Sequence, residues 1–509
     1  MKPDKTSTTP LYIQIREELR QSIVDGNLKK GERLPAVTAL AEEKGVTAAT
    51  IRRALQDLID EGLITSHVGR GTFVHEGTSV TTNKPETIQS RGPSTEALFA
   101  ARKLRQNISR SLSDMMQLAH KPGVIAFTRG IGDPDMVESG VLARLAQTAL
   151  SGGEEIFRDY GDPQGLLPLR EAIADLYGEQ NIDVSPDQIL VTSGSQQAIA
   201  LIAQQSAENG TPVICETPCY TGVTNAFSAF GIQTDTIIRE SDGPNSDVIR
   251  HILSPGCVSG TVFYLCPVLH NPTGTDISPK KQKLISDWAK KYNGTVLADE
   301  VFRDLHFIGD DCNPVPESFL VTAGAEHSVI LGSLSKSFIS GLRVGWIVTS
   351  TDRIRSLTHI KKAMDLGCPP LMQGIAQAFL EDKDGYRAHR ERVRAHYRHL
   401  RDITIESLST YMPEGISWTI PQGGFQLWVT LPKGFSSINL FLRSVEKGAA
   451  FLPGPLQDIN NRFMNAFRLC YGSLKKEDIE EGIRRLGQAT AEYLTEAPGD
   501  SGITGLGDF

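Results

Sequence analysis

The chain has 509 residues, about three times the commonest domain size, so two or more domains are expected. Hydrophobic residues make up 39% of the sequence and charged residues 22%, a composition that excludes a chain disordered throughout. The formal net charge of −8 excludes a general attraction to nucleic acid or to anionic membranes. Any DNA-binding surface must therefore be local.

The sequence predicts neither a membrane span nor a metal site. No apolar run reaches the roughly 18 residues that a membrane helix needs, and the N-terminus lacks the apolar core of a signal peptide. We therefore expect a cytoplasmic protein without membrane contact. The seven cysteines are scattered and lack the spacing of metal ligands, so we interpret them as reduced and mostly buried.

Residues 1–75 are predicted to form a winged helix-turn-helix unit. Apolar residues recur every four positions from Leu11 to Ile23, as on the buried face of a helix. Gly45 provides a tight turn, and Thr47 is the predicted N-cap of the helix that follows. Two extended runs joined by a Gly-containing turn predict a hairpin. The predicted elements are helices over about 11–24, 36–44 and 48–61 and strands over about 63–66 and 72–74.

Basic side chains of this unit are predicted to lie where a winged helix contacts DNA. Arg52 and Arg53 fall on the exposed side of the third helix, the recognition helix, and Arg33 precedes the second helix. Arginines in such places contact phosphates and position the recognition helix in the major groove. For each of them alone, a solvated charged face is the alternative interpretation. The predicted DNA-binding residues are Arg33, Thr47, Thr50, Arg52, Arg53, His67 and Arg70.

A flexible linker, a large α/β domain and a disordered tail are predicted to follow. Residues 76–95 are rich in Thr, Ser, Pro and Gly and lack apolar periodicity, as a linker does. Over residues 96–494, strand-like apolar runs alternate with helix-length segments, which indicates a mostly parallel sheet with helices on both faces. Residues 495–509 are polar and rich in Gly, which is typical of a disordered tail.

Strand ends of the predicted α/β domain carry polar residues that could bind an anion or react. Residues 192–198 change from strand to helix, and the N–H groups there could bind an anion, although such a segment is more often only a turn. Asn271 follows another strand in an irregular Pro- and Gly-containing loop, and Asp299 ends a third, where a buried carboxylate needs a partner. Lys336 follows a fourth strand among small residues, where desolvation lowers the pKa of an amine and makes it reactive.

In this order, the motifs resemble those of the fold-type I pyridoxal-phosphate aminotransferases over about residues 120–490. The resemblance implies a smaller C-terminal α+β subdomain and pyridoxal 5′-phosphate as the cofactor. It implies that Lys336 and Asp299 are catalytic, the first bound covalently to the cofactor and the second paired with its pyridinium nitrogen. Asn271 is implied to hydrogen-bond the phenolic oxygen. The residues implied to hold the phosphate are Gly194, Ser195, Gln196, Ser333, Ser335 and Arg343.

Three further residues match the same family, and one departs from it. The resemblance implies that Tyr220 stacks on the cofactor ring and that Tyr160 reaches the phosphate of the neighbouring subunit. It implies that Arg468 binds the substrate α-carboxylate in a bidentate fashion. Phe302 stands where the family usually has a tyrosine whose hydroxyl binds the phenolic oxygen, so we expect weaker catalysis.

The first unit resembles the winged helix of the GntR family of bacterial regulators. The segments PLY, GERLP and GRGTFV occur in the order typical of that family. Two positions depart from it, because Thr38 and Ala48 stand where the family usually has arginine. These departures remove two expected DNA contacts.

Together, the two resemblances are those of the MocR-type regulators. They imply a pyridoxal-phosphate-dependent transcription regulator that senses the cofactor or an amino compound and binds double-stranded DNA as a head-to-tail homodimer. The alternative is an active aminotransferase with a weak or vestigial DNA-binding domain, which Thr38 and Ala48 favour and Phe302 disfavours. Any transamination is expected to be slow. The sequence specifies neither the effector nor the operator, nor whether the protein activates or represses.

Overall fold

The computed structural model describes residues 11–24, 28–29, 31–60, 64–67, 71–74, 115, 117–151, 160–252, 260–309 and 312–496. The chain divides into two compact units, Met1–Ser90 and Arg91–Phe509. The predicted linker over 76–95 and all but the first two residues of the predicted tail over 495–509 lie outside the described ranges. No helix within those ranges is long and apolar enough to span a membrane.

The first unit contains three helices and a two-stranded antiparallel hairpin, as predicted. Helix α1 packs against α3, and apolar side chains such as Ile15 and Ile51 are buried between them. Gly45 ends α2 in the left-handed conformation, and Thr47 Oγ1 accepts a hydrogen bond from Thr50 N at 3.3 Å, which confirms the predicted turn and N-cap. The elements are α1 (Leu11–Val24), α2 (Val37–Lys44), α3 (Ala48–Asp60), β1 (Ile64–His67) and β2 (Gly71–Val74).

The second unit is built on an eight-stranded sheet in the order β4-β11-β10-β9-β8-β5-β6-β7. Strands β10, β9, β8, β5 and β6 run parallel, which confirms the predicted, mostly parallel sheet. Strand β11 is antiparallel to both β4 and β10, so β4 points the same way as the central strands. The strands are β4 (Ile189–Thr192), β5 (Val213–Thr217), β6 (Thr234–Glu240), β7 (Gly243–Pro244), β8 (Val262–Leu265), β9 (Thr295–Asp299), β10 (Ser328–Ser333) and β11 (Gly345–Val348).

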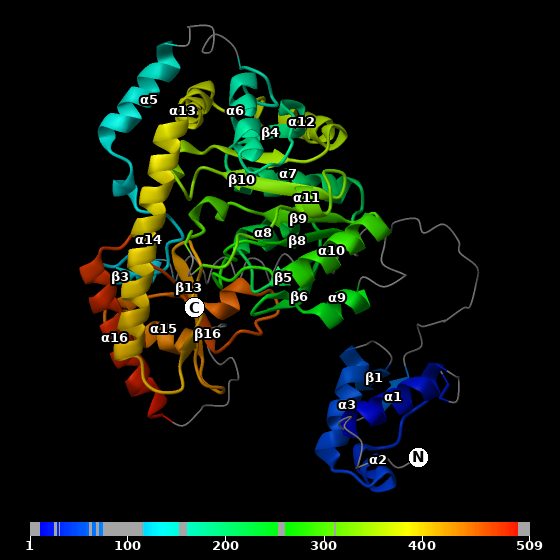
Figure 1. Cartoon of the computed structure of the whole chain (residues 1–509). Coiled ribbons are helices and arrows are strands. Elements are labelled where there is room, and N and C mark those ends of the chain that lie inside the picture. Colours follow the sequence, from blue (N-terminus) through cyan, green and yellow to red (C-terminus); the bar gives the residue numbers. More distant parts are fainter. Residues whose placement is uncertain are drawn as a thin grey trace. The chain divides into compact units, whose positions relative to one another are not determined.

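Helices cover both faces of this sheet, because alternate strand residues point to opposite faces. Ile189 and Val191 join one buried cluster with residues of α5, α6, α10 and α13, whereas Leu190 joins another with residues of α7, α8 and α12. In Figure 1, α6 and α13 lie side by side near β4. The helices are α5 (Ser139–Ser151), α6 (Leu167–Gly178), α7 (Ser195–Glu208), α8 (Thr221–Ala229), α9 (Ser246–Ile252), α10 (Pro279–Tyr292), α11 (Phe319–Thr322), α12 (Thr351–Asp365) and α13 (Pro370–Glu381).

A smaller α+β subdomain follows the long helix α14 (Lys383–Tyr411), which runs along one side of the second unit in Figure 1. Its antiparallel sheet has the order β12-β13-β16-β15, and α16 packs against α14 and α15. Buried Leu427, Phe467 and Ile483 join these elements in one apolar cluster. The further elements are β3 (Ile125–Ala126), β12 (Ser417–Trp418), β13 (Gln426–Thr430), α15 (Ser437–Glu446), β14 (Ala449–Ala450), β15 (Leu452–Pro453), β16 (Ala466–Cys470) and α16 (Lys476–Leu494).

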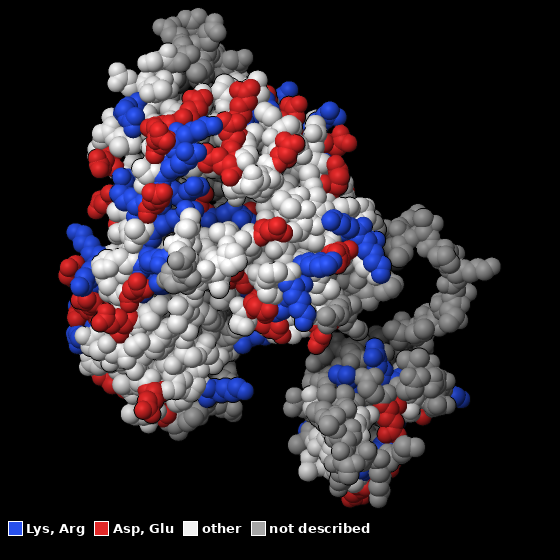
Figure 2. Space-filling view, in the orientation of Figure 1, with Lys and Arg blue, Asp and Glu red and all other residues white. Residues whose placement is uncertain are grey.

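The charged side chains and the cysteines lie where the sequence predicts. Lys and Arg are mixed with Asp and Glu over the face of the second unit seen in Figure 2. Cys312 is half-buried, and the other described cysteines are buried, as predicted. They are Cys215, Cys219, Cys266, Cys368 and Cys470.

Candidate active site and nucleic-acid interface

Parallel strands bring the main predicted site residues to one edge of the large sheet. Asp299 is the last residue of β9, whereas Asn271 and Lys336 follow the neighbouring strands β8 and β10. Because β4 points the same way, the turn into α7 at Gly194 lies at this edge as well. Open α/β sheets bind their ligands beyond the carboxyl ends of the strands. The structure therefore places these four residues where a ligand of this fold binds.

Lys336 is held in a site that favours its neutral amine. Its Nζ donates a hydrogen bond to Gly130 O at 2.6 Å, from the segment that follows β3. Burial lowers the pKa of Lys336, and the nearby charge of Arg468 lowers that pKa further. A lowered pKa leaves more of the amine unprotonated near neutral pH, as a nucleophile requires.

Asp299 is paired with a tyrosine that the sequence analysis does not identify. Tyr264 in β8 donates its hydroxyl hydrogen to Asp299 Oδ2 at 3.0 Å, and both residues are buried. Burial raises the pKa of Asp299, whereas the hydrogen bond from Tyr264 lowers it. A sequence signal did exist, because a tyrosine inside an apolar strand needs a partner for its hydroxyl.

Arg468 in β16 is oriented by two hydrogen bonds and retains donors for a ligand. Its Nη1 donates to Asn271 Oδ1 at 2.9 Å and its Nη2 donates to Thr128 O at 2.9 Å. Its Nε is buried and has no hydrogen-bond partner within the described ranges. A fixed guanidinium of this kind suits bidentate binding of a carboxylate.

The predicted phosphate-binding residues form a cradle at the start of α7. A Cβ atom at Gly194 would lie 2.7 Å from Arg343 Nη2, so this close approach requires glycine. Arg343 Nη2 donates to Ser193 O at 3.0 Å, which holds the guanidinium at the turn. Ser335 Oγ is buried without a partner among the described residues. A cation, an unpaired hydroxyl and a helix N-terminus together fit a bound phosphate.

The remaining cradle residues flank this turn. Ser195 and Gln196 open α7, and Gln196 Nε2 donates to Gly222 O at 3.0 Å. Ser333 Oγ accepts a hydrogen bond from Ser335 N at 3.1 Å. These bonds fix the two loops between which a phosphate group would lie.

The two predicted tyrosines differ in their surroundings. Tyr220 precedes α8 and is half-buried, and burial together with the charge of Asp299 raises the pKa of its hydroxyl. Its ring lies against Gly222, where a Cβ atom would collide with it. Tyr160 is 74% exposed, so within one chain it is not part of the buried wall of the site.

Phe302 places an apolar ring beside the amine of Lys336. The ring is 2% exposed and packs edge-on against Phe425, with ring centroids 5.5 Å apart. Lys336 Nζ lies 5.6 Å from the centroid of the Phe302 ring. The position that usually carries a hydroxyl in this fold therefore offers no hydrogen bond to a ligand.

The structure describes only part of the predicted DNA-binding set. Arg52 lies exposed on α3, Thr47 is exposed at its start, and Thr50 Oγ1 lies 2.9 Å from Thr47 Oγ1. Arg33 is exposed and pairs through its backbone with Phe73 of the hairpin. The remaining predictions fall outside what is described, namely the side chains of Arg53 and His67 and the whole of Arg70.

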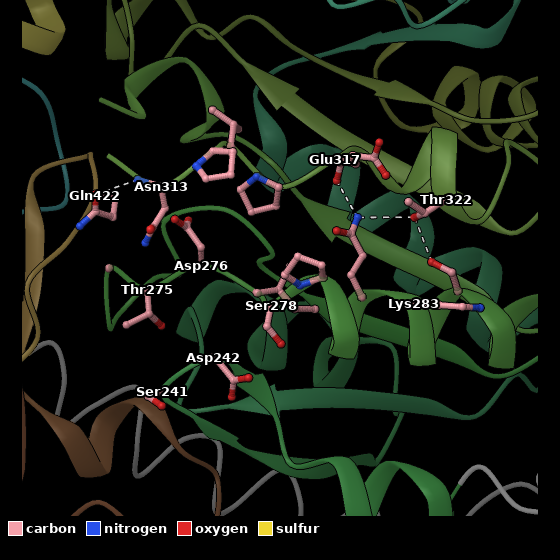
Figure 3. A pocket seen from close by; sticks show the side chains of 18 of the residues that line it. Ser241, Asp242, Thr275, Asp276, Ser278, Lys283, Asn313, Glu317, Thr322 and Gln422 are labelled. Atoms are coloured by element: carbon pink, nitrogen blue, oxygen red, sulfur yellow. Dashed lines mark hydrogen bonds between the residues drawn. The ribbon is translucent and has the colours of Figure 1, made fainter. Parts of the chain in front are cut away.

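A separate cavity of about 890 Å³ lies between α10 and the loops around residues 274–279 and 313–317. None of the predicted site residues lines it. Some of its polar groups bond to one another, as Figure 3 shows around Glu317 and Thr322, where Gln282 Nε2 donates to Glu317 O at 2.6 Å and Ser286 Oγ to Thr322 Oγ1 at 2.9 Å. Pairing of this kind leaves these groups less available to a ligand.

Comparisons with known proteins match both units. The uncharacterised HTH-type transcriptional regulator YisV of Bacillus subtilis is 28% identical over 497 residues, which cover 97% of this chain and 98% of that protein. The 2-aminoadipate transaminase of Thermus thermophilus is 32% identical over 384 residues, which cover 75% of this chain and 94% of that enzyme. The crystal structure of LysN, an α-aminoadipate aminotransferase of Thermus thermophilus complexed with N-(5′-phosphopyridoxyl)-L-leucine, aligns with a TM-score of 0.68 and 31% identity, covering 74% of this chain and 94% of that one.

The fold and its site define a fold-type I pyridoxal-phosphate protein joined to a winged helix. The chain belongs to the class I and II aminotransferase family, whose model matches residues 130–486, and residues 11–74 match the gntR family of bacterial regulatory proteins. It is a transcription regulator of the MocR type, and its cofactor is pyridoxal 5′-phosphate. The predicted fold class, family and cofactor are thereby confirmed.

Proposed function

We propose that the second unit binds an amino compound with a carboxylate and that this binding changes the affinity of the protein for double-stranded DNA. The observation that carries the proposal is the guanidinium of Arg468, fixed beside the amine of Lys336 and retaining an unused Nε. The backbone of Gly130 connects the two, because it accepts from Lys336 and lies against the guanidinium. A carboxylate bound there would leave the amino group of the ligand close to Lys336.

Each residue of the site would then have a separate role toward the cofactor or the ligand. Pyridoxal phosphate supplies an aldehyde carbon that reacts with amines and a ring that takes up electrons. Lys336 offers its neutral amine to that carbon, and Asp299 holds a proton at the ring nitrogen. Arg343 and the N-terminus of α7 bind the phosphate, while Arg468 orients the ligand through its carboxylate.

The second part of the proposal is a cytoplasmic, head-to-tail homodimer. A tyrosine that is 74% exposed, as Tyr160 is, can reach a site on another chain. In such a dimer, two winged helices would bind two half-sites of one DNA molecule. Sedimentation of the purified protein, with and without DNA, measures this state directly, and a monomer in both samples would contradict it.

An active aminotransferase is the second candidate function. The relationship to the Thermus 2-aminoadipate transaminase and the presence of Lys336, Asp299, Asn271 and Arg468 favour it. Phe302 disfavours fast turnover, because it removes a hydroxyl that would tune proton transfer. We therefore expect any conversion of amino acids to be slow compared with the typical enzyme range of about 1–1000 per second.

DNA retention and turnover distinguish the two functions. Full-length protein is assayed for retention of genomic duplex fragments at physiological salt, with and without a mixture of amino acids, and for transfer of their amino groups to 2-oxoglutarate. If the protein is a regulator, we expect DNA retention that changes when amino acids are added and little transfer of amino groups to 2-oxoglutarate. Lys336→Ala, which removes the reactive amine, should abolish borohydride-trapped cofactor. Rapid sustained transfer without DNA retention would establish the enzyme instead.

A further inference from the structure

The segment that follows β3 carries a cation between two residues that touch the site. Thr128 O accepts a hydrogen bond from Arg468 Nη2 at 2.9 Å, and Gly130 O accepts one from Lys336 Nζ at 2.6 Å. Arg129 stands between them in the chain, and its side chain is exposed. Adjacent Cα atoms are about 3.8 Å apart, so the backbone of Arg129 belongs to the wall of the site.

The charge of Arg129 is not neutralised within the described ranges. No hydrogen bond or ion pair joins Arg129 to another residue that the structure describes. The first carboxylate further along the chain is already engaged, because Asp133 Oδ2 lies 3.1 Å from His396 Nε2 and Asp133 Oδ1 accepts from Asp135 N. An arginine without a partner at the wall of a ligand site is available to bind an anion.

Two glycines near Arg129 let the main chain approach Arg468 and Tyr397 closely. A Cβ atom at Gly130 would lie 3.9 Å from both Nη1 and Nη2 of Arg468, so the main chain here runs along the guanidinium. At Gly132, a Cβ atom would lie 2.6 Å from Tyr397 Oη, so this position also excludes a side chain. Arg129 is therefore the cationic side chain closest in sequence to this stretch of the wall.

The charges of the site indicate which kind of ligand group Arg129 would bind. The phosphate of the cofactor matches Arg343, and the α-carboxylate of an amino acid matches Arg468. Neither of these anions requires Arg129. A ligand with a further acidic group would use it, gaining a charge-assisted contact and faster association with a positively charged entrance.

We propose that Arg129 binds the side-chain acid of the ligand, so that the protein recognises an amino acid with a second carboxylate. This inference rests on the proposed function, because it assumes that the α-carboxylate binds Arg468. Arg129 is then a specificity-determining residue, which selects acidic over neutral amino acids of the same length.

Paired ligands test this selectivity in the full-length holoprotein. L-Glutamate and L-glutamine have the same shape and differ in the side-chain charge, as do L-2-aminoadipate and its side-chain amide. Binding is measured through the absorption spectrum of the cofactor and by calorimetry. We expect each acid to bind about tenfold more tightly than its amide, which corresponds to about 1.4 kcal/mol. Arg129→Gln should remove that difference by weakening the acids alone.

A control variant and the competing outcomes make the test decisive. Arg355→Gln changes an exposed arginine of α12 that pairs with Asp352, and it should leave the preference unchanged. Equal binding of acid and amide, or equal weakening of both by Arg129→Gln, would overturn the role of Arg129 while leaving the proposed function intact. Absence of any spectral response to either pair in the cofactor-bound protein would overturn the acidic ligand assigned to Arg129, whereas the proposed function is tested separately by DNA retention with the mixture of amino acids.

Discussion

At the scale of single residues, the hydrogen bond from Tyr264 opposes the effect of burial on the charge of Asp299. Burial favours the protonated carboxyl and raises its pKa, whereas the donated hydrogen bond stabilises the carboxylate. A carboxylate is required if Asp299 is to pair with a protonated ring nitrogen. Tyr264 therefore acts through Asp299 and is a positioning residue for the cofactor.

Removing this hydroxyl should destabilise the cofactor-free protein more as the pH rises. Because the pKa of Asp299 is raised by folding, the folded state binds a proton more tightly than the unfolded state, and stability falls as pH rises from roughly 3.9 through the folded pKa. Tyr264→Phe raises the folded pKa further and should cost about 1–3 kcal/mol where Asp299 is ionised. Urea unfolding from about pH 5 to about pH 8 measures the difference.

Another buried tyrosine provides the control for Tyr264→Phe. Tyr177 accepts a hydrogen bond from Trp346 Nε1 at 3.2 Å instead of donating to a carboxylate. The loss of stability caused by Tyr177→Phe should therefore be the same at every pH. A loss for Tyr264→Phe that is equally independent of pH would disprove its link to Asp299.

Phe302→Tyr should restore a hydroxyl beside Lys336 and accelerate amino-group transfer. One hydrogen bond is worth about 1 kcal/mol, and about 1.4 kcal/mol changes a rate tenfold, so we expect an increase of about fivefold. Stopped-flow absorbance under single-turnover conditions measures the rate. Phe302→Leu keeps the site apolar and should give no increase. An unchanged rate in Phe302→Tyr with normal cofactor binding would show that the missing hydroxyl does not limit the reaction.

At the scale of elements, the sequence predicts where strands end better than which distant segments meet there. Asp299 and Lys336 are found because each follows a short apolar run, a local pattern. The antiparallel insertion of β11 between β4 and β10 has no local signature, because strand order depends on contacts between residues far apart in the chain. The same holds for Thr128 and Gly130, whose carbonyl groups reach residues more than 200 positions away.

A buried ion pair fixes the loop that presents Asn271. Arg239 in β6 lies 2.7 Å from Glu216 in β5 and donates to Thr275 O at 3.1 Å, and Glu216 also accepts from the N–H of Cys266. The Asn271 loop is thus tied at both ends to charges with no solvent exposure. The position of Asn271 therefore depends on the Arg239–Glu216 ion pair, although neither of these two residues is predicted to contact the cofactor or the ligand.

Arg239→Met should destabilise the second unit by about 3–5 kcal/mol, because it leaves the Glu216 carboxylate buried without its partner. Urea unfolding and the dissociation constant of the cofactor both report the loss. The double variant Arg239→Met with Glu216→Gln removes the unpaired charge and should recover part of the stability. A double variant no more stable than the single one would contradict this explanation.

Recognition helix α3 should contribute to DNA binding through Arg52. Arg52→Ala should weaken binding to all duplex sequences and reduce the slope of log affinity against log salt by roughly one, because one phosphate contact is lost. Fluorescence anisotropy at several salt concentrations measures both effects. Arg355→Ala, in α12 of the second unit, is the control. An unchanged slope in Arg52→Ala would exclude a phosphate contact by this residue.

At the scale of the whole molecule, the amino compound can change DNA binding only if it binds two conformational states of the protein with different affinities. If the amino compound raises or lowers DNA affinity by some factor, DNA must change the affinity for the amino compound by the same factor. This equality holds whatever the arrangement of the units. It therefore tests regulation without any assumption about how they contact each other.

Arg468→Ala should separate ligand sensing from DNA binding. The variant keeps Lys336, so cofactor should still bind, and it keeps the winged helix, so DNA affinity without ligand should be unchanged. Without the carboxylate-binding guanidinium, L-glutamate should no longer alter DNA affinity, whereas in the unmodified protein we expect a change of about 5- to 150-fold, the usual range of such coupling. Anisotropy titrations of DNA with and without L-glutamate, paired with spectral titrations of L-glutamate with and without DNA, give the two factors. An undiminished effect in Arg468→Ala would place regulation outside this site, whereas two factors that differ in the unmodified protein would show that one titration had not reached equilibrium.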